Sequence, residues 1–159
     1  MGSFPTRGTN FKIGEYNIKK HFTKEKGDLG VAKVFSDLVS KEYYVFFSIS
    51  EHLPFDLISY KEGKFSRISV KYRNMNKGTI SVKFASSYSD KNGTHITPIN
   101  KNDVDIIAIY CPETDLCYYI DPKKFNKSIS LRIENPINKV GTINYSIDYL
   151  EIPNLGENI

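Results

Sequence analysis

The stretch PFDLISYKEGKFSRISVKYR, residues 54–73, decides the fold prediction. Its apolar and polar residues predict two strands, 55–61 and 65–73, joined by a tight turn from Lys61 to Lys64. Side chains alternate across a strand, so the second strand has one polar, cationic face and one apolar face. The polar face carries Arg67, Ser69, Lys71 and Arg73, and the apolar face carries Ile68, Val70 and Tyr72. The hairpin therefore predicts a half-buried sheet that presents a polar face.

Asp56 lies at the start of the first of these strands, within hairpin reach of the polar row. A carboxylate beside a lysine on adjacent strands is the arrangement that metal-assisted phosphodiester cleavage uses. The carboxylate can hold a hard divalent cation through oxygen. The metal lowers the pKa of a bound water, and the lysine orients or deprotonates that water. Asp56 and Lys71 are therefore the candidate catalytic pair.

The segment before the hairpin predicts a helix followed by a strand. In GDLGVAKVFSDLVSKE the apolar residues recur at three- and four-residue spacing, which predicts an amphipathic helix over about 28–41. The nearly continuous apolar run YYVFFSIS, 43–50, predicts a buried strand. Further upstream we expect a short helix from Ile13 to Phe22 and a loose tail over residues 1–11.

The segment after the hairpin is β-rich. We expect a strand at 79–89, a loop through SDKNGTHITPINKND, and a hairpin of 105–111 and 116–121 that turns from Pro112 to Asp115. Two more β-like runs occupy 128–133 and 142–152. A helix followed by a mostly antiparallel sheet predicts an α/β (α+β) fold, in one domain that spans 1–159.

Composition limits the functional class only loosely. A chain of 159 residues can bury one substantial core. It has no apolar run near the roughly 18 residues that span a bilayer and no apolar segment in Met1 to Asn10, so we expect an intracellular protein. Cys111 and Cys117 do not have the spacing of a CxxC motif and are predicted to be reduced core residues.

The quoted segments resemble the PD-(D/E)xK nuclease superfamily. The resemblance is greatest to group I intron-associated (homing) endonucleases and more distant to archaeal Holliday-junction resolvases. It runs through 26–38 and 50–73 and continues more loosely over 103–121. It implies a restriction-endonuclease-like core, in which helices flank a mixed β-sheet.

The resemblance implies that Asp56 is the metal-binding aspartate and Lys71 the catalytic lysine. It also shows two departures. The second acid of the family, two residues before the lysine, is here Ser69, and the glutamate expected on the first helix aligns with Val31.

Three acids could complete the metal shell in place of these positions. Asp28 lies three residues before Val31, hence on the same helix face. Its position equally suits the N-cap or first turn of that helix. Glu51 precedes Asp56 by five residues and could be a ligand or an ordinary surface residue, and Glu15 is the candidate if the first short helix is the relevant one.

A basic band is the candidate DNA surface. It consists of Arg67, Arg73, Lys77, Lys83 and Lys91. The band could follow a phosphate backbone, or it could be a solvated sheet edge that discourages aggregation. The net charge of +4 suits a nucleic-acid partner but is shared by many proteins that bind none.

The function expected from the resemblance is a Mg²⁺- or Mn²⁺-dependent endonuclease that hydrolyses double-stranded DNA, of the homing type. Because one active site addresses one strand, we expect a homodimer or a higher homo-oligomer. Two alternatives remain open. One is a structure-selective nuclease that acts on Holliday junctions, and the other is a DNA-binding derivative that has lost catalysis, which Ser69 and Val31 would favour.

Overall fold

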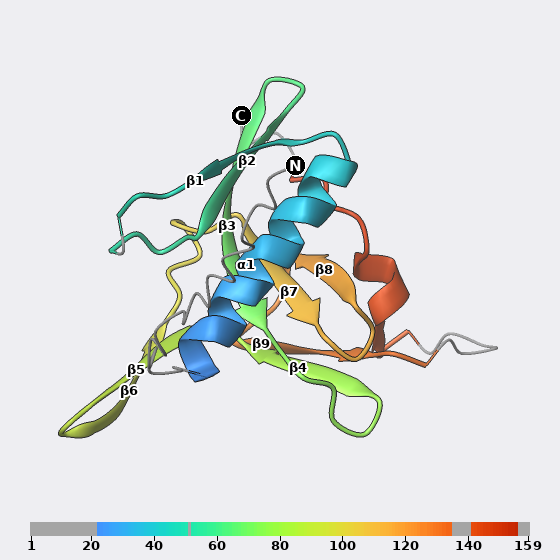
Figure 1. Ribbon diagram of the computed structural model, residues 1–159. Coiled ribbons are helices and arrows are strands. Elements are labelled where there is room, and N and C mark those ends of the chain that lie inside the picture. The colour runs from blue at the N-terminus through green and yellow to red at the C-terminus, as the bar shows by residue number, and fades with distance from the viewer. Residues whose placement is uncertain (1–21, 51, 135–140, 156–159) are drawn as a thin grey trace, which may run out of the picture.

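The computed structural model describes residues 22–50, 52–134 and 141–155. In this part, the helix α1 (Phe22–Ser40) packs diagonally across a five-stranded mixed sheet (Figure 1). The strand order is β1 (Tyr44–Phe47), β2 (Leu57–Lys61), β3 (Lys64–Tyr72), β7 (Ile106–Cys111) and β8 (Leu116–Ile120). The tail expected over residues 1–11 and the short helix expected before Phe22 lie outside the described residues.

The central sheet is mixed because one neighbouring pair is parallel. β1, β2 and β3 form an antiparallel meander, β3 and β7 run parallel, and β7 and β8 form an antiparallel hairpin. The β2–β3 turn is formed at Glu62 and Gly63, both with positive φ. This hairpin and the β7–β8 hairpin were predicted correctly, within one or two residues at each end.

A smaller sheet packs on the face of the central sheet that α1 leaves free. It is three-stranded, in the order β10 (Asn144–Tyr145), β9 (Ser128–Arg132) and β4 (Thr79–Lys83). The 3-10 helices η1 (Pro122–Lys124) and η2 (Ser146–Tyr149) lie in the chain after β8 and β10. The predicted fold class, an α/β (α+β) fold built on a mixed sheet, is confirmed. In the described residues, α1 covers one face of the central sheet and strands cover the other.

The core has two halves, one on each face of the central sheet. On the α1 side, Val34 and Leu38 pack with Leu57, Ile68 and Ala108. On the other side, Ile107 and Ile109 of β7 pack with residues of the small sheet, which are Ile80, Val82, Ile129 and Leu131. β7 is buried on both faces, which explains its continuous apolar sequence.

α1 begins six residues earlier than predicted, at Phe22. Lys24, Glu25 and Lys26 are good helix formers, and the helix continues through Gly27 at a cost of about 1 kcal/mol. Asp28 therefore lies inside the helix, and the alternative that makes it the N-cap is wrong. Gly30 brings the helix close to the sheet, since a Cβ there would lie 3.5 Å from side-chain atoms of both Val70 and Tyr72.

Strand β1 is shorter and more exposed than the buried strand predicted at 43–50. It is the edge of the central sheet, and Tyr44 and Phe46 are 70% and 50% exposed. Its continuous apolar sequence arises because Val45 packs toward α1 while the alternate residues face outward. The prediction of burial was therefore wrong.

The region 79–103, predicted as one strand and a loop, contains three strands, and the last two form a separate hairpin. β4 ends at Lys83, and β5 (Ala85–Asp90) then pairs with β6 (Gly93–Pro98) across a turn at Lys91 and Asn92. This hairpin projects from the body as an arm (Figure 1). The run predicted at 142–152 is likewise mostly not a strand, because two residues of it pair with β9 and η2 follows. No helix in the described ranges is long and apolar enough to cross a membrane.

Candidate active site

The polar row predicted on β3 exists and faces away from α1. Val70 and Tyr72 contact Gly30 of the helix, so the alternate residues Ser69 and Lys71 lie on the opposite face. In the parallel pairing with β7, Ser69 is level with Ile107 and Lys71 with Ile109, and both isoleucines point into the core beneath the small sheet. The row therefore lies at the border of that sheet.

Asp56 is held against β3 by two hydrogen bonds. Its backbone N–H donates to the carbonyl of Ile68 at 2.8 Å. Its carboxylate Oδ2 accepts the backbone N–H of Val70 at 2.6 Å. The paired part of β2 begins at Leu57, so the carboxylate takes the place of a strand partner for Val70. These two bonds bracket Ser69 and place the carboxylate one residue away from Lys71.

Lys71 lies in an environment that disfavours its charged form. Burial lowers the pKa of Lys71, and repulsion from Arg73 lowers it further, while attraction to Asp56 acts in the opposite direction. The net shift is downward. Within the described residues Lys71 and Asp56 form no direct salt bridge, so their attraction acts through space. A lysine with a lowered pKa is more often neutral near physiological pH than an exposed one, and only the neutral amine can accept a proton.

Arg73 is fixed beside this pair. Its Nη1 donates to the carbonyl of Tyr72 at 2.8 Å, and burial lowers its pKa. Its backbone N–H donates to the carbonyl of Tyr110 on β7. The guanidinium is therefore a positive charge that stays near Lys71.

The donor set fits a divalent cation only in part. Asp56 is exposed, and its Oδ1 makes no hydrogen bond to the described residues, so one hard oxygen is available. However, the described residues contain no group of three His, Cys, Asp or Glu side chains that could hold a metal ion. One such oxygen could serve a divalent ion that keeps several of its waters and is also held by substrate phosphates.

Ser69 and Val31 occupy the positions where the resemblance leads one to expect acids. Ser69 is 4% exposed and shares its strand face with Lys71. Val31 is partly buried and packs on the α1 side of the core. Neither supplies a carboxylate.

The structure does not bring Asp28 to Asp56. At roughly 100° per residue, Asp28 lies about 160° around the helix from Gly30, which faces the sheet. Asp28 is accordingly exposed. Glu51 and Glu15, the other acids considered, lie outside the described residues.

Arg67, one of the candidate DNA contacts, forms an ion pair with Asp105 within the fold. Its guanidinium binds Asp105 at 2.9 Å, with a further bond to the carbonyl of Asn102 at 2.7 Å. Hydrogen bonds and charge from Arg67 lower the pKa of Asp105 despite the opposing effect of burial. The pair joins the start of β3 to the start of β7.

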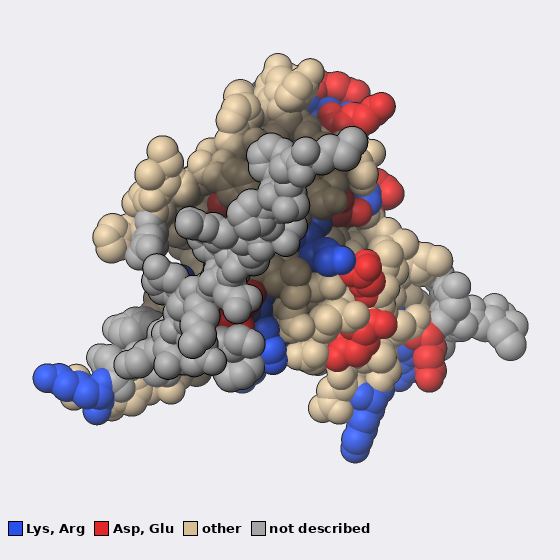
Figure 2. Space-filling view, viewed as in Figure 1, with Lys and Arg blue, Asp and Glu red and all other residues tan. Residues whose placement is uncertain are grey.

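The other basic candidates are more accessible. Lys77, in the loop between β3 and β4, has φ of 49° and is exposed, as are Lys83 and Lys91. In the space-filling view, basic side chains stand at the tips of the arm formed by β5 and β6 and of the β3–β4 loop (Figure 2). In Figure 1 both projections lie in the lower part of the view, the arm on the left and the loop on the right.

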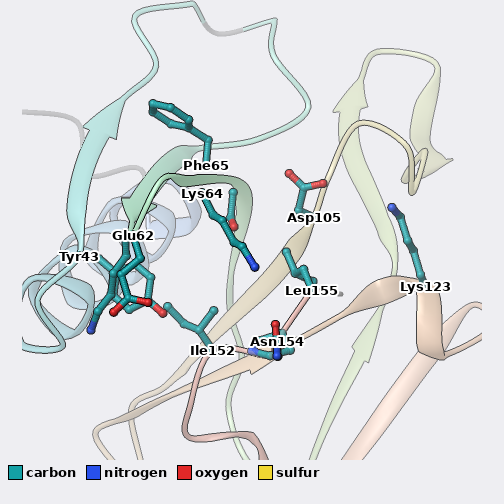
Figure 3. A pocket seen from close by; sticks show the side chains of 12 residues that line it. Tyr43, Glu62, Lys64, Phe65, Asp105, Lys123, Ile152, Asn154 and Leu155 are labelled. Carbon is teal, nitrogen blue, oxygen red and sulfur yellow. The ribbon is translucent and has the colours of Figure 1, made fainter. Parts of the chain in front are cut away.

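A pocket of about 680 Å³ lies elsewhere, at the other end of β3. It is lined by the β2–β3 turn and by the C-terminal segment, and Figure 3 shows Lys64 and Lys123 on two sides of Leu155. Asp56, Ser69 and Lys71 do not line it. The pocket therefore does not contain the candidate catalytic residues. We identify the candidate active site from Asp56 and Lys71 and not from the pocket.

The fold is that of a PD-(D/E)XK endonuclease. The profile of that family matches residues 21–152, and the chain belongs to it. The structure is also similar to that of a bacterial homing endonuclease, I-Ssp6803I, with a TM-score of 0.65 and 20% sequence identity over 80% of this chain and 88% of that one. Among curated proteins, none matches the sequence.

Membership of the family has direct consequences for function. The chain is a nuclease whose substrate is DNA, and enzymes of this family generally use divalent metal ions. The resemblance over segments 26–38, 50–73 and 103–121 predicted this family correctly. The Val70 N–H, which holds Asp56, was not predicted, because side-chain patterns do not indicate which backbone donor a carboxylate meets.

Proposed function

We propose that this protein is a Mg²⁺-dependent, homing-type DNA endonuclease in which Asp56 and Lys71 form the catalytic pair. The observation that carries the proposal is the hydrogen bond from Val70 N–H to Asp56, which holds a carboxylate beside β3 one residue from Lys71. A carboxylate and a lysine of lowered pKa on neighbouring strands supply an oxygen ligand and a proton acceptor.

Each residue has a separate role in this proposal. Asp56 holds the metal through Oδ1, while Oδ2 stays bonded to Val70. Lys71 orients the attacking water and accepts its proton. When bound, a divalent ion would neutralise charge on the scissile phosphate and make the water more acidic. Burial favours the neutral form of Lys71 by lowering its pKa, and repulsion from Arg73 acts in the same direction.

The rest of the metal shell is less complete. Because Asp28 lies on the side of α1 that faces away from the sheet, we leave it out of the shell. Ser69, Glu51 and Glu15 are then the candidate ligands beside Asp56. With one carboxylate and a neutral hydroxyl, the site would bind Mg²⁺ more weakly than a site with two carboxylates. We therefore expect cleavage to require a high Mg²⁺ concentration, or Mn²⁺ in its place.

The homing-type assignment rests on similarity to I-Ssp6803I, whose fold this chain shares. Homing endonucleases cut both strands of a duplex, and a single Asp56–Lys71 pair addresses one strand. The proposal therefore includes a homodimer or a higher homo-oligomer. It also includes an intracellular location, where the DNA substrate is found.

The proposal is tested by incubating the protein with supercoiled plasmid and with a synthetic four-way junction, each in Mg²⁺, in Mn²⁺ and in EDTA. A homing-type enzyme converts plasmid to discrete linear products only when metal is present. Preferential cutting of the junction would support the junction-resolving alternative. Binding of DNA without cleavage in either metal would support a derivative that has lost catalysis.

A further inference from the structure

The outer edge of the central sheet is apolar and carries no charge. The run from Tyr43 to Ser50, which contains β1, has no Lys, Arg, Asp or Glu. β1 is the first strand of the sheet, with β2 on its inner side (Figure 1), and among the described residues no strand pairs with its outer side. We call the exposed apolar side chains of this run the β1 edge. They are Tyr44, Phe46, Phe47 and Ile49.

The side chains of the β1 edge are well exposed. Tyr44, Phe46 and Phe47 are 70%, 50% and 58% exposed, and Ile49 is fully exposed. Neighbouring rings extend the same apolar surface inward, because Phe46 lies 6.5 Å from Phe65 and Tyr44 lies 6.2 Å from Tyr60, between ring centroids. Phe47 lies on the other face of the strand, where its ring stacks on that of Phe35 of α1 at 5.1 Å between centroids. Exposed apolar side chains gathered at one edge of a folded protein mark an interaction surface.

DNA is a poor partner for the β1 edge. Binding to the phosphate backbone depends on Lys and Arg, and the run from Tyr43 to Ser50 has neither. The exposed basic residues Lys77, Lys83 and Lys91 belong instead to β4 and to the loops that flank it and β5. The two surfaces therefore have different chemistry and suit different partners.

The β1 edge also lacks the features that prevent an edge strand from pairing with a strand of another molecule. Such strands usually carry lysine, an inward charge, proline or a bulge, because a bare edge pairs with any available strand. β1 is a regular strand whose four residues all pair with β2, and its sequence YVFF contains none of these features. The opposite edge strand, β8, differs because four of its five residues are buried and η2 packs against it.

The available area is a large part of what a dimer interface buries. Covering an aromatic side chain completely buries roughly 150–250 Å². The exposed fractions of the four side chains of the β1 edge then correspond to about 500 Å² per chain, before any backbone is counted. A standard interface buries about 800 Å² per partner, so these residues supply more than half of it.

We propose that the β1 edge binds the β1 edge of a second copy of this chain, by antiparallel pairing of β1 with its symmetry mate. Antiparallel pairing of a strand with itself creates a closed two-fold dimer. It also joins the two central sheets into one, with the same face of each on the same side. Lys71 lies on the sheet face that carries Tyr60 and Phe65, since Tyr60 pairs with Phe65 and side chains alternate along β3.

This geometry has a consequence for the reaction. Both Asp56–Lys71 pairs of such a dimer open on the same side of the joined sheet, where one duplex could meet both. The inference deepens the proposed function, because it names the surface that would bring two active sites to one DNA molecule. The pairing itself is argued from the β1 edge alone and can fail or succeed independently of catalysis.

The test compares the wild type, Phe46→Asp and Ile147→Asp by sedimentation velocity over a range of micromolar concentrations without DNA. Phe46→Asp places like charges against each other across the two-fold axis and is expected to weaken dimerisation by about a hundredfold. Ile147 is 47% exposed on η2, away from the β1 edge, so Ile147→Asp is the matched control and should sediment as the wild type does. Melting curves establish that both variants fold, and Tyr44→Lys repeats the test if Phe46→Asp does not.

A wild type that stays monomeric at every concentration would overturn the proposal, and so would equal dimerisation of all folded variants. A plasmid assay on the same samples separates this result from the proposed function. If the interface is correct, the folded Phe46→Asp variant nicks plasmid but no longer linearises it in one binding event. If catalysis fails in every sample while the wild type dimerises and Phe46→Asp does not, the interface stands and the proposed function falls.

Discussion

The carboxylate of Asp56 accepts the backbone N–H of Val70 at 2.6 Å, on the strand residue that immediately precedes Lys71. Because this bond uses one carboxylate oxygen, Asp56→Asn can keep the bond through its amide oxygen while losing the charge that a metal requires. We expect the variant to bind DNA as the wild type does and to lose cleavage by at least about a hundredfold.

The matched control for that experiment is Asp28→Asn. It makes the same chemical change on the side of α1 that faces away from the sheet. Its cleavage rate should equal that of the wild type, measured on the same plasmid in Mg²⁺. An active Asp56→Asn variant would remove Asp56 from the role proposed here, and a slow Asp28→Asn variant would contradict the placement of Asp28 outside the site.

Lys71 should impose a pH dependence on cleavage. Burial lowers its pKa, and Arg73 lowers it further, so the neutral amine forms below the ordinary lysine value of 10.5. Cleavage should rise as pH increases through this lowered pKa, because only the neutral amine accepts a proton. Arg73→Gln removes the repulsion and should move the rising limb to higher pH.

Arg73→Lys is the control for this shift, since it keeps the positive charge at the same position. The measurement is single-turnover cleavage against pH, in saturating metal, for the wild type and both variants. If the two substitutions leave the same profile, the repulsion between Arg73 and Lys71 does not set the pH dependence.

Local sequence patterns predicted the parts of this fold that depend on local geometry. The alternation along residues 65–73 predicted which side chains share the face of β3 with Lys71, and the contacts of Gly30 confirm it. Three- and four-residue spacing predicted α1, although its start was misplaced at Asp28. These patterns report strand and helix periods directly, because each side chain's direction follows from its position in the element.

The wrong predictions concern contacts between segments that are distant in the sequence, and a local pattern does not report such contacts. The sequence YYVFF is equally compatible with a central strand and with an uncovered edge, and its actual exposure depends on which strand ends the sheet. The strand β6 was predicted as part of a loop, because its segment is polar and rich in turn formers, and most of β5 was predicted as a continuation of β4. The bond from Val70 to Asp56 depends on strand register and was not predictable from residue types.

The basic residues should divide into two groups when tested. Lys77 and Lys83 are exposed, so Lys77→Gln and Lys83→Gln should each lower the slope of log affinity against log salt by about one, with little change in melting temperature. Arg67 is paired with Asp105, so Arg67→Gln should instead destabilise the fold. We expect a loss of about 1 kcal/mol, because the arginine is about one third exposed and solvent screens the pair.

Fluorescence anisotropy with labelled duplex at several salt concentrations gives the slopes, and urea unfolding gives the stabilities. A lysine variant that leaves the salt slope unchanged does not contact phosphate. An unchanged stability for Arg67→Gln would mean that the pair with Asp105 contributes nothing measurable to the fold.

The last prediction concerns Ser69, which lies two residues before Lys71, where the resemblance leads one to expect an acid. Asp56 is bonded to the residues on either side of Ser69, and Ser69 shares its strand face with Lys71. A side chain at position 69 should therefore face an ion held by Asp56. A hydroxyl is a weaker ligand for a hard cation than a carboxylate is. We expect Ser69→Glu to lower the Mg²⁺ concentration needed for half-maximal cleavage, and Ser69→Ala to change it little.

Ser69 is 4% exposed, so Ser69→Glu places a larger, charged side chain in a buried position, which can destabilise the fold. The uncharged isostere Ser69→Gln is therefore the control for size, and melting curves must show that each variant folds. The measurement is cleavage rate against Mg²⁺ concentration. If Ser69→Glu folds with an unchanged melting curve but needs as much Mg²⁺ as Ser69→Gln, position 69 does not face the ion. The register that places Lys71 beside Asp56 in the catalytic site would then be wrong as well.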